Sequence, residues 1–181
     1  MNLGSDQLLK LAKWKSVKEN WISFEDDDRP IANYECLDRD LKNIKCYKVI
    51  ESDGWQYSDT YFDYFFYTSC ESDKIGMTIH GVHVSLNRFA PIGIYCKGSI
   101  TFHESGKGMS RPKYENLYQI PESKFHSLEI EIINNFKKNN IYMPSLRELG
   151  QTIPFKLPEL FASEANLGKS IIFDIIINDL Y

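Results

Sequence analysis

The histidine pair in TIHGVHVS is the short motif that could most readily bind a metal ion or take part in catalysis. His80 and His83 are three residues apart, and in a later segment His103 is followed directly by Glu104. Two imidazoles and a carboxylate can bind zinc and activate a water molecule. In an unbroken strand, however, a spacing of three directs the two rings to opposite faces. A metal-dependent hydrolase or transferase that uses these four residues therefore requires a bulge at Gly81 and is our alternative function.

The other short motifs that could support chemistry are incomplete. Asp38-Arg39-Asp40 is a DxD pattern, which some glycosyltransferases use for manganese, but so short a pattern is common by chance. NLGKS at 166–170 lacks the first glycine of a phosphate-binding loop, because position 163 is serine. The sequence contains no GxSxG nucleophile elbow. We therefore predict no catalytic residue, no cofactor and no metal site.

The segment WQYSDTYFDYFFY, residues 55–67, is unusually rich in aromatic side chains. If 61–68 forms a strand, alternation places Phe62, Tyr64 and Phe66 on one face and Tyr61, Asp63, Phe65 and Tyr67 on the other. A platform for stacking bases would need neighbouring cations, whereas the nearby charges are acidic. A strand buried on both faces is our main expectation. A protein-binding patch is the best functional interpretation, because Tyr and Trp dominate interface hot spots, and sugar binding remains open.

Negative charge is concentrated in one part of the chain. Residues 19–75 carry fourteen acids and six bases, a net charge of −8, whereas the whole chain has −4. Such a segment repels nucleic acid and attracts a basic partner. The first 20 residues lack the pattern of a secretory signal, and no apolar run is long enough to cross a membrane. We expect a cytoplasmic protein whose four cysteines are free and mostly buried.

The periodicity of apolar residues predicts an α+β fold with an N-terminal helix, a central mainly antiparallel sheet, and C-terminal helices packed on it. We expect one globular domain over residues 1–181. Strands are predicted at 31–37, 44–50, 61–68, 76–80, 82–89, 93–95 and 99–103, and a loop at 104–116. Helices are predicted at 5–22, 122–140, 146–149 and 157–165. The segment 170–181 is compatible with a strand or a helix, and we favour a helix.

In size and general character the chain resembles the bacterial immunity proteins that neutralise polymorphic or contact-dependent toxins. The stretches that prompt this comparison are FEDDD at 24–28 and the aromatic segment at 55–67. The resemblance implies a binding protein without catalytic activity that occludes the active site of a cognate, basic, nuclease-type toxin. A structural or regulatory subunit with another partner remains an alternative. The residues predicted to bind the partner are Asp26, Asp27, Asp28, Trp55, Tyr57, Asp59, Tyr61 and Asp63.

Overall fold

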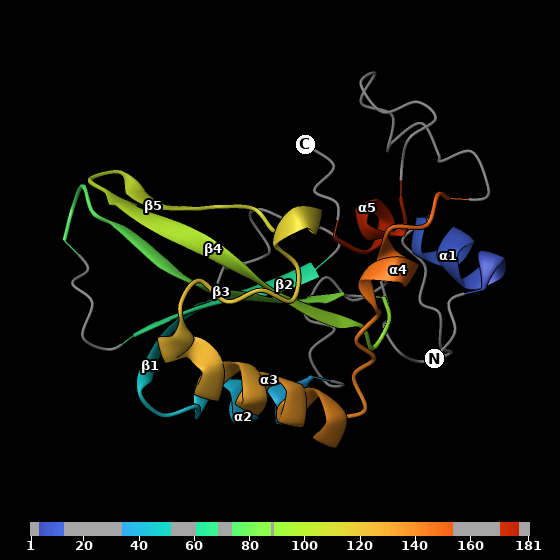
Figure 1. The fold of residues 1–181 in the computed structure, drawn as a ribbon, viewed down its shortest axis with the longest axis horizontal. Helices are drawn as coiled ribbons and strands as arrows, with labels where there is room; N and C mark the ends of the chain where they lie inside the picture. Colours follow the sequence, from blue (N-terminus) through green and yellow to red (C-terminus); the bar gives the residue numbers. More distant parts are fainter. Residues whose placement is uncertain are drawn as a thin grey trace.

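The fold is built around one antiparallel sheet of five strands in the order β1-β2-β3-β4-β5 (Figure 1). The computed structural model describes residues 4–12, 34–51, 61–68, 74–87, 89–153 and 171–177. The strands are β1 (Tyr47–Glu51), β2 (Tyr61–Thr68), β3 (Thr78–Asn87), β4 (Gly93–His103) and β5 (Gly106–Met109). Because each strand pairs with its neighbour in sequence, the predicted antiparallel meander and the α+β class are confirmed.

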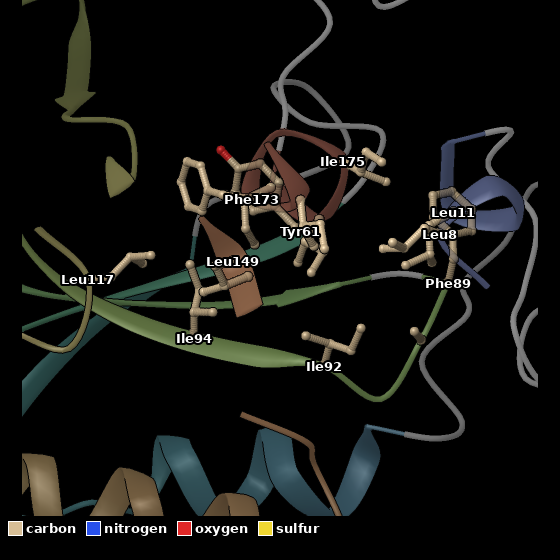
Figure 2. Packing of buried hydrophobic residues seen from close by; sticks show 14 of the residues in the cluster. Leu8, Leu11, Tyr61, Phe89, Ile92, Ile94, Leu117, Leu149, Phe173 and Ile175 are labelled. Atoms are coloured by element: carbon tan, nitrogen blue, oxygen red, sulfur yellow. The ribbon is translucent and has the colours of Figure 1, made fainter. Parts of the chain in front are cut away.

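Helices lie on both sides of the sheet. On one face, α2 (Glu35–Lys42) and α3 (His126–Lys138) lie side by side (Figure 1). Three other helices, α1 (Ser5–Ala12), α4 (Leu146–Leu149) and α5 (Ile172–Ile177), gather near one end of the sheet. Their apolar side chains form a separate core cluster with residues of β2 and β4 (Figure 2). The sheet therefore separates the core beneath α2 and α3 from the core at α1, α4 and α5.

Strand β2 is buried on both faces, as the aromatic alternation predicted. Tyr64 and Phe66 pack in the core beneath α2 and α3. Phe65 and Tyr67 face the opposite way and join a small cluster with β3 and β4. Tyr61, at the start of the strand, belongs to the core cluster that also includes residues of α1, α4 and α5 (Figure 2). The aromatic residues of the described part of this segment thus belong mainly to the interior.

The strand predicted at 31–37 is wrong over its described part. Residues 34–37 form a turn and the first residues of α2. Leu37 and Leu41 are both fully buried, and their four-residue spacing puts them on one helix face. The β-branched and aromatic residues near position 31 suggested a strand, but the helical period begins only with the leucines.

Two strands are longer than predicted, and one was missed. The strands predicted at 76–80 and 82–89 are replaced by one continuous strand, β3, over 78–87, and 93–95 and 99–103 both belong to β4. The glycines that suggested breaks, Gly81 and Gly98, are paired across β3 and β4. Aromatic rings lie where their side chains would be, Phe65 over Gly81 and His83 over Gly98, so the ladder continues. The predicted loop at 104–116 contains β5 and a short 3-10 helix, η1 (Tyr114–Asn116).

The C-terminal predictions are mostly confirmed. A 3-10 turn, η2 (Ser123–Phe125), leads into α3, and the predicted apolar face is buried at Phe125, Leu128, Ile132 and Phe136. Helix α4 has the predicted bounds and begins with a capping box between Ser145 and Glu148. Residues 172–177 are helical, in agreement with the interpretation that we favoured. The helix predicted at 157–165 and residues 13–22 of the first helix lie outside the described residues.

Candidate functional site

The buried polar side chains of the described residues lie on one face of β2 and β3. They are Asp63, His83, Ser85 and Asn87. Asn87 has a structural role, because its amide nitrogen donates to the carbonyl oxygen of Ile176 in α5 at 2.8 Å. The other three meet in the middle of the sheet, together with a hydroxyl from the end of β5.

These groups form a chain of hydrogen bonds from a carboxylate to an imidazole to a hydroxyl. His83 Nδ1 lies 3.0 Å from Asp63 Oδ2, and His83 Nε2 lies 3.2 Å from Ser110 Oγ. Ser85 Oγ donates to the second carboxylate oxygen, Asp63 Oδ1, at 3.0 Å. The backbone N–H of Ser99 donates to Ser110 Oγ at 2.8 Å. We refer to this arrangement as the Asp63–His83–Ser110 chain.

The register of the sheet explains why these side chains meet. Asp63 in β2 lies opposite Ser85 in β3, and His83 is two residues away on the same face. From β3, the His83 ring reaches across β4 at Gly98, which has no side chain to block it. Ser110 directly follows β5, and its backbone N–H bonds to the carbonyl oxygen of Ser99 in β4. Adjacent strands thus bring together residues that are 47 positions apart in the sequence.

The order of groups in this chain is the one that activates a hydroxyl nucleophile. When Nδ1–H donates to the carboxylate of Asp63, Nε2 is free to accept the hydroxyl proton of Ser110. His83 is completely buried and Asp63 is 7% exposed, whereas Ser110 is half-buried. Ser110 is therefore the one member of the Asp63–His83–Ser110 chain that a molecule in solution can contact.

A second potential nucleophile on this face, Cys96, is unreactive because its thiol stays protonated at neutral pH. Burial raises the pKa of its thiol to about 12, and the negative charge of Asp63 acts in the same direction. A hydrogen bond from the backbone of Lys113 opposes the shift without cancelling it. The thiolate is the reactive form of cysteine, so Cys96 does not compete with Ser110 at neutral pH.

Contrary to our expectation of mostly buried thiols, Cys36 and Cys46 are exposed.

The histidines of the metal-dependent alternative do not converge. Strand β3 pairs without interruption through Gly81, so His80 and His83 point to opposite faces. His80, His103 and Glu104 are exposed, whereas His83 is buried. Within the described ranges, no three His, Cys, Asp or Glu side chains are grouped as ligands of a metal ion. The geometry that this alternative requires is therefore absent there.

Both carboxylates of the DxD pattern, Asp38 and Asp40, bond to side chains of the fold. Asp38 accepts a hydrogen bond from the hydroxyl of Tyr64 at 2.8 Å and pairs with Lys42 at 2.9 Å. Asp40 pairs with Lys138 of α3 at 2.8 Å. The two carboxylates thus anchor α2 to the sheet and to α3.

Two of the residues predicted to bind a partner are buried. Tyr61 is 5% exposed and belongs to the core cluster that includes residues of α4 and α5, and Asp63 bonds to His83 and Ser85. In this conformation neither side chain is accessible to another protein, so at these two positions the structure agrees with the expected buried strand and not with the predicted partner contact. The other six residues, Asp26, Asp27, Asp28, Trp55, Tyr57 and Asp59, lie outside the described residues.

The acidic excess lies outside the described residues as well. Of the fourteen acids and six bases in residues 19–75, five of each belong to described positions. The remaining nine acids and one base carry the whole net charge of −8. They belong to residues 19–33, 52–60 and 69–73.

Sequence reasoning missed the role of Ser110, although two signals were present. Asp63 stands on a predicted strand face among aromatic residues, where an acid requires a partner. Gly98 interrupts the alternation of β4 at the position opposite Gly81. Neither signal identifies His83 or Ser110, because the pairing of strands is needed to place them.

No family model, curated protein or solved structure matches this chain. Among the helices of the described ranges, none combines the length and apolar character required to span a membrane.

Proposed function

We propose that the protein is an immunity protein, which binds a cognate basic toxin of the nuclease type in the cytoplasm and occludes its active site. The observation that carries this proposal is the concentration of net negative charge in a few segments of the sequence. Six of the eight excess negative charges of residues 19–75 belong to residues 19–33 and 52–60. These two segments contain all six predicted partner-binding residues that remain after Tyr61 and Asp63 are removed.

The two segments join the described fold at the same end of the sheet. Tyr34 follows the first segment, and its hydroxyl shares one proton between the carbonyl oxygens of Asn87 and Ala90, which lie 2.6 and 2.8 Å away. Its ring packs edge-on against Phe62, next to the residue that follows the second segment, with 6.0 Å between centroids. Glu51, which precedes the second segment, lies opposite Tyr64 in the same hairpin. This proximity supports a common binding surface.

The expected mechanism combines electrostatic steering with aromatic anchors. A cluster of acids accelerates the encounter with a basic protein, and the acceleration falls as salt screens the charges. Trp55 and Tyr57 supply the large side chains that usually dominate the binding energy. Because a nuclease binds polyanionic nucleic acid, a basic active-site cleft suits an acidic inhibitor.

The test begins with an affinity pull-down from the host, followed by an assay of the captured protein. We expect a basic protein whose nuclease activity falls as one equivalent of this chain is added. Replacing Asp26, Asp27 and Asp28 with Lys should lower the association rate constant by about 10-fold or more and weaken its salt dependence. The control carries the same charge change at three exposed acids elsewhere, Glu104, Glu115 and Glu122. Equal association rates for the two triple variants would contradict the proposal.

A further inference from the structure

We infer that Ser110 is a nucleophile activated by His83 and Asp63, and that the protein hydrolyses carboxylic esters through an acyl-Ser110 intermediate. This activity goes beyond the proposed binding function and does not depend on it. The two involve different residues and can be tested separately.

The bonding of Ser110 leaves its oxygen able to attack an electrophile. A hydroxyl oxygen has one proton and two lone pairs. In the tautomer that carries its proton on Nδ1, His83 Nε2 accepts the hydroxyl proton of Ser110 across 3.2 Å, and one lone pair of Ser110 Oγ accepts the backbone N–H of Ser99 at 2.8 Å. The second lone pair remains for a substrate carbon, and Ser110 is half-buried rather than enclosed.

The buried pair behind Ser110 is organised to take up a proton. Asp63 is held by two hydrogen bonds, from Ser85 and from His83, so the carboxylate is fixed in position. The His83 ring packs against Phe65, with 4.9 Å between centroids. The surrounding face is otherwise apolar, with Phe65, Ile79 and Ile100 buried nearby. Burying a carboxylate–imidazole pair in such a core is expensive compared with apolar residues, which favours a functional reason for it.

The proposed reaction is a two-step ester hydrolysis with balanced proton transfers. Ser110 Oγ forms a bond to the carbonyl carbon while His83 Nε2 takes the hydroxyl proton, and Asp63 stabilises the resulting imidazolium. The bond to the alcohol oxygen then breaks, and Nε2 returns the proton to that oxygen. A water molecule attacks the acyl-Ser110 and gives one proton to Nε2, which passes it to the departing Ser110 oxygen. The net change is ester plus water to acid plus alcohol.

The charges around Ser110 favour a substrate that carries a negative charge. Residues 105–114 contain no acid, and Lys107, Arg111 and Lys113 lie within three positions of Ser110. All three are exposed. An anionic ester is therefore attracted to this part of the surface, whereas a cationic one is repelled.

The first experiment is labelling of the full-length protein with a fluorophosphonate, read by intact mass and peptide mapping. We expect one adduct per chain, on Ser110, and its loss in Ser110→Ala. Ser105→Ala, at the turn before β5, is the matched control and should label like the wild type. Absence of the adduct in folded wild-type protein, or its persistence in Ser110→Ala, would overturn the inference.

A second measurement tests the role of the buried pair without removing it. In Ser110→Cys the thiol replaces the hydroxyl beside His83, so its alkylation by iodoacetamide should persist to lower pH than in Ser105→Cys. Identical pH profiles would show that His83 does not activate this position. For hydrolysis, a p-nitrophenyl ester with a free carboxylate should be cleaved faster than a neutral ester of equal length, and Ser110→Ala should slow it at least about 100-fold.

The outcomes separate this activity from the proposed binding function. Ser110→Ala should bind and inhibit the toxin like the wild type. The triple Lys variant at Asp26–Asp28 should still form the fluorophosphonate adduct. Loss of both properties in either variant would contradict the independence of the two sites.

Discussion

The substitution Gly98→Ala tests the idea that a missing side chain in β4 allows the Asp63–His83–Ser110 chain to form. A Cβ atom at position 98 would lie 2.1 Å from Cδ2 and 2.4 Å from Nε2 of His83. It would also lie 2.9 Å from Ser110 Oγ. The His83 ring is completely buried, so it cannot move aside into solvent without opening the core.

The expected loss of stability follows from two effects. Forcing an extra methyl group into a packed site costs about 1–3 kcal/mol. Displacing the ring leaves buried polar groups of His83 or Asp63 without partners, which costs a further 1–3 kcal/mol or so. The free energy of unfolding should therefore fall by about 2–6 kcal/mol. That loss is a large fraction of the stability of an ordinary domain.

The measurement is urea unfolding of Gly98→Ala beside Gly108→Ala, which makes the same change in the neighbouring strand. At Gly108 the nearest atom to an added Cβ is Nε2 of the exposed His103 side chain, at 3.3 Å, and this side chain can move aside. The control should stay within about 1 kcal/mol of the wild type. Equal stabilities of the two variants would refute the close packing of His83 over Gly98.

Two further predictions concern groups whose pKa is shifted. At pH 8, iodoacetamide should alkylate the exposed Cys36 of the native protein, whereas Cys96 should react only after unfolding, because burial raises the pKa of its thiol to about 12. Equal alkylation rates of Cys36 and Cys96 in the native protein would contradict this prediction. Hydrogen bonds from Tyr142 and Ser145 hold the pKa of Glu148 below its usual range. The ionised carboxylate of Glu148 therefore contributes to the free energy of unfolding above about pH 4, and this contribution is lost as the pH falls through the lowered pKa. Relative to Glu148→Gln, the wild type should therefore lose stability between about pH 5 and pH 3. The loss should be less than about 1 kcal/mol, because solvent partly screens the site. The measurement is urea unfolding of both proteins across this range, and a stability difference that does not change with pH would contradict the assignment.

Local sequence patterns determined most of the secondary structure. The four-residue spacing of Leu128, Ile132 and Phe136 predicted α3 and its buried face, because a helix places such residues on one side. The alternation in β2 predicted a strand, and its apolar content predicted burial on both faces. Glycines were misleading at Gly81 and Gly98, since rings from other strands replace the missing side chains there.

The sequence by itself determined an antiparallel meander, a long amphipathic helix, and an acidic, aromatic middle segment. Only the tertiary structure decided that His80 and His83 diverge, because this requires β3 to be continuous through Gly81. Only the tertiary structure brought Asp63, His83 and Ser110 together, because strand register and the opening at Gly98 set their distances. Periodicity acts over a few neighbouring residues, whereas a site made from three segments depends on pairing across the sheet.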